Sequence, residues 1–369
     1  MTGVKSRLAV PALRIALVAP PLLPVPPPAY GGTERVIHAL AEGLHGQGHD
    51  VTLFASGDSN VSCRLVPTVQ RACWTGGSSD VETSFQHVLD AVWRERGRFD
   101  VIHSHLDTRG FEFASASDTP AVSTMHGRLD EPMTQDALHT HPDVPLVAIS
   151  HSQRALAPGA RWVGVVPHGL DLHRMPFGST PGPYLLFVGR IASEKGIVEA
   201  IQLAERTRQR LVIVAKVFDA TESVLFQTEV RPALQPGRIE YLGELDSAVR
   251  DPLFAGARAT LMLGDWPEPF GLVAIESLAA GTPVVGRRRG AIPEIVEHGV
   301  DGFLIDDLDA AVEAVAAAGS LDRRRIRSRA ISRFSTSRMV DDYLVVYKRI
   351  LEGGGPGSEQ VNRLEVVAP

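Results

Sequence analysis

Residues 264–304 read GDWPEPFGLVAIESLAAGTPVVGRRRGAIPEIVEHGVDGFL, and this stretch decides how the chain is organised. Two carboxylates, Glu268 and Glu276, stand in it with seven residues between them. The prolines on either side of Glu268 favour extended backbone, so we expect this glutamate in a loop. Apolar residues at helical spacing follow from Leu272 to Ala279 and stop at Gly281, a residue typical of a helix C-terminus. The pattern predicts a helix that carries Glu276 in its second turn.

The start of this helix is a candidate anion site. The first backbone N–H groups of a helix, here from Phe270 to Val273, have no partner inside it. Gly271 has no side chain, so a ligand can approach the backbone closely. Free N–H groups at a helix start bind anions, most often phosphate. A surface helix with a solvated glutamate explains the same spacing, and the spacing alone leaves both interpretations open.

The stretch resembles the donor site of the retaining glycosyltransferases of family four, which have the GT-B fold. The shared residues are Glu268, Phe270, Gly271, Glu276, the turn 281–284 (GTPV), and the segments 293–296 (PEIV) and 299–303 (GVDGF). The resemblance implies that Glu268 holds hydroxyls of the transferred sugar and that Glu276 holds the ribose of the nucleotide. It also implies that the backbone amides of Phe270, Gly271 and Leu272 face the diphosphate or the sugar.

Composition and charge narrow the class of protein. A chain of 369 residues is long for one core and suggests two domains of roughly 150–200 residues each. A net charge of −6 argues against a nucleic-acid-binding protein, which usually has a basic excess. The two cysteines, Cys63 and Cys73, do not make a disulfide framework, and no Cys/His spacing indicates a zinc site. We therefore expect a cytoplasmic protein.

One apolar segment near the N-terminus was a candidate membrane or signal segment. It runs from Leu8 to Val25, but Arg14 and several prolines interrupt it. No uninterrupted apolar run approaches the roughly 20 residues that a membrane span needs. We expect a strand over Arg14–Ala19 instead.

A glycine pair follows this strand. Gly31-Gly32 lies where a proline-rich loop meets a helix that is predicted to start at Thr33 and end at Gly46. The three-glycine dinucleotide fingerprint is absent, so a simple turn is one explanation of the pair. The resemblance favours a functional one, because the family carries a glycine pair beside the donor phosphates and the acceptor cleft.

Histidines gather near the ends of predicted strands. His103, His105 and Asp107 alternate, so on a strand they share a face. They are compatible with a metal site, but we favour a position along the cleft at the carboxyl end of a parallel strand. His126 follows strand Ala121–Met125, where a structural hydrogen-bonding role is the ordinary explanation. The resemblance implies instead a place near the reacting sugar carbon. His168 stands where the family's inter-domain turn usually carries Asn.

The second half of the chain restarts with a strand at Tyr184. Lys195 falls at or just before the next helix start, where a cation opposes the helix dipole and so indicates a nearby anion. A solvated lysine is the alternative until Arg190 is considered with it. The resemblance implies that Arg190 and Lys195 hold the diphosphate and stabilise the leaving nucleotide. Lys216, at a strand end, fits either a phosphate or sugar contact or a surface position.

The C-terminal part is predicted to be helical. Six arginines (Arg323, Arg324, Arg325, Arg327, Arg329 and Arg333) fall in one helix, and we expect them to form a solvated face. Attraction to anionic lipid is the weaker alternative, so we expect at most peripheral membrane contact. A last helix is expected near Ser337–Leu351.

These observations predict an α/β protein with two Rossmann-like, doubly wound domains that face a cleft, as in the GT-B fold. The resemblance implies an N-terminal acceptor-binding domain over residues 1–170 and a C-terminal nucleotide-sugar-binding domain over residues 171–335. It also implies that residues 336–351 form a helix that crosses back to the first domain. We expect residues 352–369 to form a disordered tail.

The resemblance implies transfer of a sugar from a nucleotide-diphosphate sugar to an acceptor hydroxyl with retained configuration. No Asp-x-Asp motif stands at a strand end, so we expect no metal and no other cofactor. The expected catalytic residues are His126, Arg190, Lys195 and Glu268. The acceptor, the donor base and sugar, and the oligomeric state are not indicated.

Three functions are alternatives to sugar transfer. The first is hydrolysis by two carboxylates. If both glutamates were helical, eight residues would separate them by about 12 Å, more than the roughly 5–9.5 Å between hydrolase carboxylates. Because Glu268 is expected in a loop, this distance does not exclude hydrolysis. An epimerase or phosphorylase of the same fold remains open. A non-catalytic nucleotide-sugar-binding module is disfavoured because Arg190, Lys195, Glu268 and Glu276 are all present.

Overall fold

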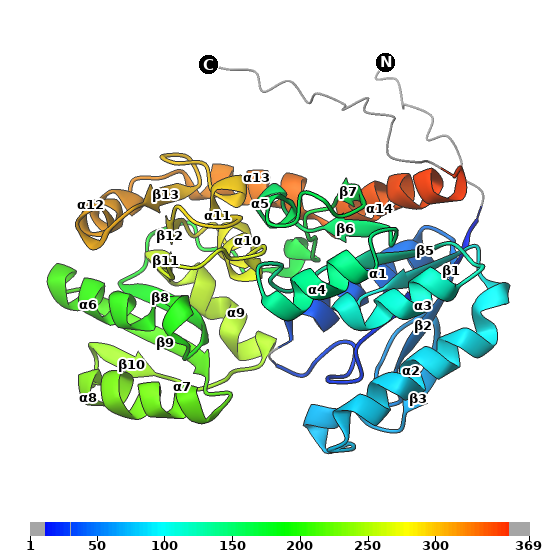
Figure 1. The fold of residues 1–369 in the computed structure, drawn as a ribbon. Coiled ribbons are helices and arrows are strands. Elements are labelled where there is room, and N and C mark those ends of the chain that lie inside the picture. Colours follow the sequence, from blue (N-terminus) through cyan, green and yellow to red (C-terminus); the bar gives the residue numbers. More distant parts are fainter. Residues whose placement is uncertain (1–11, 30, 354–369) are drawn as a thin grey trace, which may run out of the picture.

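The computed structural model describes residues 12–29 and 31–353 and contains two parallel β-sheets packed between helices (Figure 1). The first sheet has seven strands in the order β3-β2-β1-β4-β5-β6-β7, and the second has six in the order β10-β9-β8-β11-β12-β13. All strand pairs within the two sheets are parallel. The expected fold class, two doubly wound α/β units, is confirmed.

The strands of the first sheet are β1 (Arg14–Val18), β2 (Asp50–Ser56), β3 (Arg64–Val69), β4 (Val101–Ser104), β5 (Ala121–Thr124), β6 (Leu146–Ala148) and β7 (Trp162–Val165). Those of the second are β8 (Tyr184–Arg190), β9 (Arg210–Lys216), β10 (Ile239–Tyr241), β11 (Ala259–Met262), β12 (Val284–Arg287) and β13 (Gly302–Ile305).

The helices of the first half are α1 (Gly32–Gly46), α2 (Val81–Glu95), α3 (Phe111–Ala116), α4 (Pro132–Thr140) and α5 (His151–Ala155). Those that follow are α6 (Ile197–Thr207), α7 (Ala220–Leu225), α8 (Arg231–Ala233), α9 (Ser247–Ala255), α10 (Leu272–Ala279), α11 (Ile292–Ile295), α12 (Leu308–Ala318), α13 (Arg323–Phe334) and α14 (Thr336–Leu351).

The central strands are continuous apolar runs because both faces of a parallel sheet are covered. In β1 every residue after Arg14 is buried. The edge strand β3 differs, since it is partly exposed and contains Pro67. Proline cannot donate a ladder hydrogen bond and is confined largely to sheet edges. This explains why the sequence pattern did not predict β3.

The helical segment between β9 and β10 is interrupted. It is divided into α7, a π-helical turn at Phe226–Val230, and α8. Pro232 stands at the start of α8, where its missing N–H and its ring disturb the preceding turn.

The expectation of a solvated arginine face on α13 was wrong for most of its residues. Arg323 is only 4% exposed, and its guanidinium donates to the carbonyl oxygens of Gly178, Ala257 and Ala255 at 2.6, 3.0 and 3.2 Å. It also donates to the hydroxyl of Thr282. These arginine N–H groups satisfy buried carbonyl oxygens that would otherwise lack a partner.

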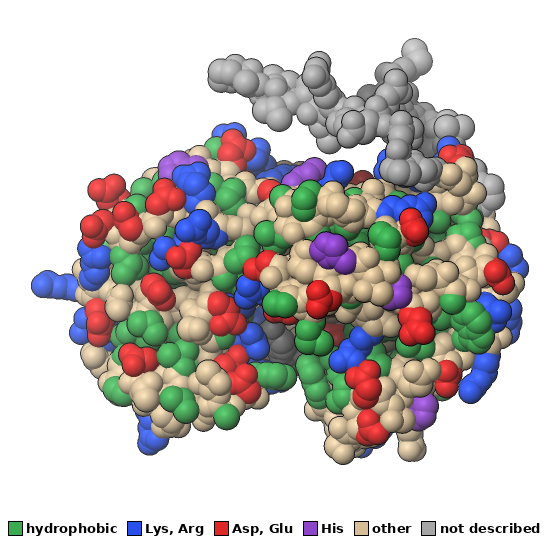
Figure 2. Space-filling model, viewed as in Figure 1, with side chains coloured by type: hydrophobic (Ala, Val, Ile, Leu, Met, Phe, Trp, Pro, Cys, Tyr) green, Lys and Arg blue, Asp and Glu red, His purple; other side chains and the backbone are tan. Residues whose placement is uncertain are grey.

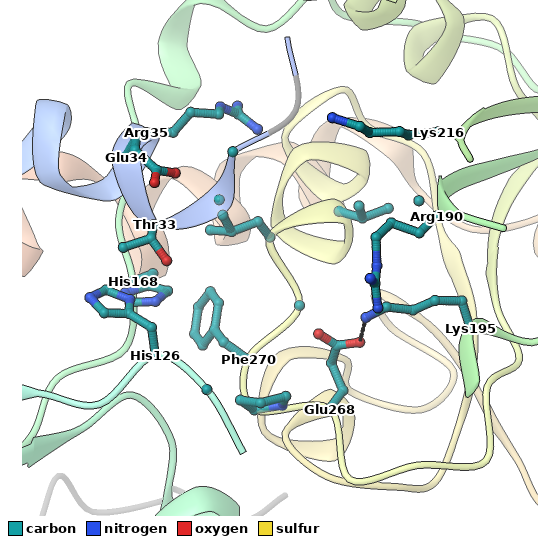
Figure 3. A pocket seen from close by; sticks show the side chains of 18 of the residues that line it. Thr33, Glu34, Arg35, His126, His168, Arg190, Lys195, Lys216, Glu268 and Phe270 are labelled. Carbon is teal, nitrogen blue, oxygen red and sulfur yellow. Dashed lines mark hydrogen bonds and ion pairs between the residues drawn. The ribbon is translucent and has the colours of Figure 1, made fainter. Parts of the chain in front are cut away.

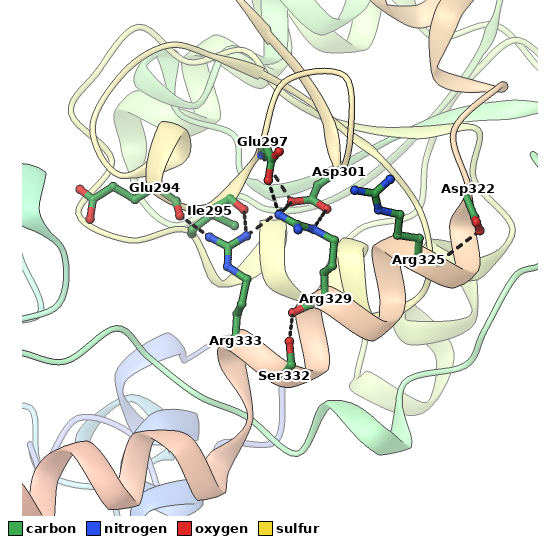
Figure 4. Close-up of polar contacts among 9 residues, drawn as sticks. All are labelled: Glu294, Ile295, Glu297, Asp301, Asp322, Arg325, Arg329, Ser332 and Arg333. Atoms are coloured by element: carbon green, nitrogen blue, oxygen red, sulfur yellow. Dashed lines mark hydrogen bonds and ion pairs between the residues drawn. The ribbon is translucent and has the colours of Figure 1, made fainter. Parts of the chain in front are cut away.

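Two more arginines of α13 bind the loop before β13. Arg329 Nε lies 2.9 Å from Oδ1 of the buried Asp301, and Arg333 Nη1 lies 3.4 Å from its Oδ2 (Figure 4). Arg327 donates to the carbonyl oxygen of Met175 at 2.8 Å. Arg324 and Arg325 are exposed. Through its arginines the helix therefore joins segments of the second half.

Helix α14 follows α13 in sequence but packs on the first half, against α1 and β7 (Figure 1). Its tyrosines Tyr343 and Tyr347 are fully buried. Tyr347 OH lies 2.8 Å from Nδ1 of His103, and Tyr343 OH lies 3.0 Å from the hydroxyl of Thr124. The chain thus returns to the first sheet after completing the second.

Over residues 12–29 and 31–353, no helix combines the length and the apolar content needed to cross a membrane. The expected disordered tail lies, from residue 354 onward, outside the described residues.

Candidate active site

A cavity of about 920 Å³ lies between the two sheets. Figure 2 shows its opening as the recess between the two halves. In each sheet the strand order reverses beside the first strand, between β1 and β4 and between β8 and β11. Loops on either side of such a reversal point leave a crevice at the carboxyl ends of the strands, where ligands bind in open α/β sheets. The two crevices face each other and form one site.

The cavity is lined by every site residue predicted from the sequence: Gly31, Gly32, His126, Arg190, Lys195, Lys216, Glu268, Phe270, Gly271, Leu272 and Glu276. Figure 3 shows Arg190, Lys195, Lys216 and Glu268 of the second half around the same space as His126 of the first half. The residues that the sequence predicts to share a site therefore line one cavity.

Glu268 lies in the loop between β11 and α10, as expected. Its N–H donates to the carbonyl oxygen of Trp266 at 2.9 Å, and its own carbonyl oxygen accepts from the N–H of Ala291 at 2.9 Å. Gly271, the residue before α10, has φ 107°, a left-handed conformation that favours glycine. Among the described residues, none accepts a hydrogen bond from the N–H groups of Phe270, Gly271 and Leu272. The helix start is therefore open to an anion.

Lys195 and Glu268 form an ion pair across the cavity floor. Lys195 Nζ lies 2.7 Å from Oε2 of Glu268 and 4.0 Å from the ring centroid of Trp266. Lys195 ends a short 3₁₀ turn, and Gly196 separates it from α6. Both side chains are mostly buried, so the pair is shielded from solvent.

Arg190, the last residue of β8, also lies between carboxylates. Its Nη2 is 3.0 Å from Oε1 of Glu194, and its Nη1 is 3.1 Å from Oε1 of the buried Glu222. Lys216, at the end of β9, lies 3.8 Å from Oε2 of Glu244. These cations of the second half are therefore held in place by acidic partners that the sequence pattern did not single out.

Glu276 is 1% exposed and is held by two arginines. Its Oε1 accepts from Nη2 of Arg250 at 2.6 Å and from Nη2 of Arg35, on α1 of the first half, at 2.5 Å. Burial favours the neutral acid, but the charges of Arg35 and Arg250 outweigh it and hold the Glu276 pKa below its ordinary value. Glu276 is thus a buried carboxylate at a contact between the two halves.

His126 lines the cavity next to a second histidine. Its Nε2 lies 2.9 Å from Nδ1 of His105, and its backbone N–H donates to Oδ1 of Asp107 at 2.7 Å. Burial lowers the pKa of His126 to about 3, so its ring is neutral at physiological pH. Its ring also stacks on His168, with centroids 5.2 Å apart. His168 in turn contacts Phe270, so the residue that replaces the usual Asn packs between the halves.

The expectation for His103 was wrong. This ring is fully buried and bonded to Tyr347 and Thr124, so it supports α14 and does not line the cleft. His105 and Asp107 do line the cavity. Within the described part of the chain, no group of three or more His, Cys, Asp and Glu residues is arranged to hold a metal.

The first half contributes several cavity residues that the sequence reasoning missed. Glu34 and Arg35 follow the glycine pair on α1, and burial raises the pKa of Glu34 to about 7. Trp74 also lines the cavity, and its ring contacts that of Phe218 of the second half, with centroids 5.3 Å apart. No local motif marks these residues; the predicted feature nearest to Arg35 in the sequence is the glycine pair Gly31-Gly32, which ends three positions before it.

Direct contacts also join the halves beside α10. The Ser150 hydroxyl donates to the carbonyl oxygen of Pro269 at 2.7 Å. The carboxylate of Glu294 accepts from the N–H groups of His151 and Ser152, at the start of α5, at 2.9 and 2.7 Å. These bonds fix the loop that carries Glu268 relative to the first half.

Comparison with known proteins agrees with this architecture. The profile of the family Glycosyltransferase Family 4 matches residues 30–174, and that of Glycosyl transferases group 1 matches residues 174–333. A glycogen synthase of Mycobacterium tuberculosis is 26% identical over 371 residues, covering 86% of this chain and 89% of that protein.

Two solved structures share the fold. AviGT4, a glycosyltransferase involved in avilamycin A biosynthesis, matches with a TM-score of 0.71 and 24% identity over 92% of this chain and 98% of that one. HepE from Anabaena, in complex with UDP-glucose, matches with a TM-score of 0.69 and 15% identity over 92% and 99%. The two family profiles together span residues 30–333, so the chain belongs to the family-four glycosyltransferases of the GT-B fold.

Proposed function

We propose that the protein transfers a sugar from a nucleotide-diphosphate sugar to an acceptor hydroxyl with retention of configuration and without a metal ion. The observation that carries the proposal is the arrangement at the start of α10, where open backbone N–H groups lie beside the Lys195–Glu268 pair. The crystallised relative with UDP-glucose supports a nucleotide-sugar donor.

In this proposal the diphosphate lies at the start of α10, with Lys195 and Arg190 as its cationic partners. Glu268 then exchanges its contact with Lys195 for hydroxyls of the transferred sugar, and Glu276 binds the ribose. The cations act on charge that grows on the leaving diphosphate, and preorganised positive charge of this kind stabilises a transition state. A metal ion would perform the same task in a site without these side chains.

The proposed chemical step breaks the bond between the anomeric carbon and the diphosphate oxygen. The acceptor oxygen forms its bond to the same carbon on the same face, and its proton passes to the departing phosphate oxygen. His126 lies at the cavity wall as a neutral hydrogen-bonding group. It therefore adds no positive charge near the anomeric carbon, on which positive charge develops as the bond to the diphosphate oxygen breaks.

The test combines thermal shift and calorimetric titration with UDP-, GDP-, ADP- and TDP-sugars. A ligand that binds only the folded state raises apparent stability. We expect one nucleotide sugar to stabilise the wild type and the matched control Arg325→Ala, and neither Lys195→Ala nor Glu276→Ala. NMR of the product anomer and assays with a chelator then test retention and metal independence. If no nucleotide sugar binds the wild type, the proposal is wrong.

A further inference from the structure

Arg35 is a cavity residue of the first half whose guanidinium is only partly used. Its Nη2 donates to Oε1 of Glu276 at 2.5 Å, and its side chain is 23% exposed. A guanidinium has five N–H donors, and no other described residue accepts from those of Arg35. Figure 3 shows this side chain reaching over the cavity toward the second half. It therefore has hydrogen-bond donors available for a ligand.

Glu276, the partner of Arg35, also uses only part of its hydrogen-bonding capacity. Both Arg35 and Arg250 bind Oε1 of Glu276, and no described residue hydrogen-bonds its Oε2. Arg250 also donates to Oδ1 of Asp251 at 2.7 Å. The four side chains carry two positive and two negative charges, so the cluster is neutral with Arg35 in place. Removing Arg35 would leave a net negative charge beside the cavity.

Arg35 belongs to one of two helix starts that meet at the cavity. Gly32, the first residue of α1, lies close to Leu272, the first residue of α10, since a Cβ built on Gly32 would lie 3.3 Å from the Leu272 side chain. Both helix starts line the cavity. An anion held between them would experience the positive ends of two helix dipoles, one from each half.

We infer that Arg35 is a donor-binding residue that the first half supplies to the nucleotide site of the second. Its uncommitted N–H groups bind the diphosphate held at the start of α10, while Glu276 keeps Oε2 for the ribose. Tight binding of the donor then requires both halves to be closed around the diphosphate. This inference rests on the proposed function and adds a residue that the sequence reasoning did not identify.

The test compares nucleoside diphosphates with nucleosides. UDP, GDP, ADP and TDP are titrated by calorimetry with the wild type, Arg35→Ala, Arg35→Lys and the control Arg109→Ala. Arg109 also lines the cavity from the first half but pairs with Glu82. For the diphosphate that the wild type binds best, we expect Arg35→Ala to weaken binding about 10-fold or more. Arg35→Lys should lose less, and Arg109→Ala should change little.

The matching nucleoside separates a diphosphate contact from an indirect effect through Glu276. We expect Arg35→Ala to change nucleoside binding less than about threefold, whereas Glu276→Gln weakens nucleoside and diphosphate together. Equal losses for both ligands in Arg35→Ala, no loss, or tighter diphosphate binding would overturn the inference and leave the proposed function standing. If the wild type binds none of the diphosphates, both fail. Should Arg35→Ala not fold, Arg35→Gln replaces it, with the same expected ratio.

Discussion

Glu34, in the first turn of α1, lines the cavity and is only 5% exposed. Burial raises its pKa from 4.5 to about 7. The folded protein therefore keeps a proton on Glu34 at pH values where the unfolded chain has lost it. Because the folded state binds more protons between these two values, the stability contributed by Glu34 falls as the pH rises from about 4.5 to 7.

Glu34→Gln should remove this pH dependence. We expect the variant to gain stability relative to the wild type as the pH rises from 4.5 to 8, by roughly 3 kcal/mol. Urea unfolding of both proteins at several pH values measures the difference. A constant difference across this range would show that the Glu34 side chain is not a buried neutral acid.

The His105–His126 contact leads to a second prediction for a single residue. His105 is 1% exposed and holds the ring of His126 through its Nδ1. His105→Leu should lower turnover on the order of 10-fold, because small displacements of positioned groups are costly in catalysis. Nucleotide binding should be almost unchanged.

His105→Asn is the matched control for that prediction. Its amide nitrogen stands near the position of His105 Nδ1, so this variant should recover much of the lost turnover. Steady-state kinetics of the three proteins measure the effect. Equal activity of His105→Leu and the wild type would exclude a positioning role.

A single site residue could be predicted from the sequence where the residues next to it along the chain indicate its environment. Glu268 beside two prolines and Lys195 at a helix start are examples, and both line the cavity. Arg35 was not predicted because its partner Glu276 lies 241 positions away. No local spacing carries information on a contact of that kind.

Among the elements, α13 shows where reasoning from patterns fails. Its six arginines were predicted to form a solvated face, because arginine is almost never fully buried without a partner. The partners of Arg323 are backbone carbonyl oxygens of distant loops, which a sequence does not display. The helices and strands with continuous or periodic apolar residues were predicted well, whereas β3 and the interrupted α7–α8 segment were not.

Two arginines of α13 should differ in how much they contribute to the stability of the protein. Arg323→Ala should destabilise the protein by about 3 kcal/mol, since it leaves several buried carbonyl oxygens and Thr282 without a donor. Arg325→Ala, at an exposed position of the same helix, should change stability by less than about 0.5 kcal/mol. Chemical denaturation measures both. Similar effects of the two substitutions would contradict the distinct roles assigned to them.

For the whole molecule, the decisive contact is the return of α14 to the first sheet. The two α/β repeats could be predicted from the order of apolar strands and helices. Their relative placement depends on contacts such as Tyr347–His103, separated by 244 positions, and on the hydrogen bonds from the start of α5 to the carboxylate of Glu294 in α11. Physical contact at this separation follows from the packing of complete elements and has no signature in a local stretch.

Tyr343→Ala tests the contribution of α14 to the first half. Removing a fully buried aromatic side chain should cost about 3–5 kcal/mol. Val345→Ala, on the same helix at a position that is 59% exposed, should cost much less. Calorimetric unfolding measures both variants. An unchanged transition in Tyr343→Ala would mean that α14 does not stabilise the first half.

The aromatic contact across the cavity opening has an optical consequence. The chain has four tryptophans, and two of them report on the site, since Trp74 touches Phe218 and Trp266 lies against Lys195. A motion that parts the two halves would remove the contact of Trp74 with Phe218 and increase the exposure of an indole that is already 47% exposed, so we expect its emission to shift toward the red. Trp74→Phe removes the contribution of Trp74 and leaves that of Trp266. The part of the emission change that this variant loses therefore measures the separation of Trp74 from Phe218.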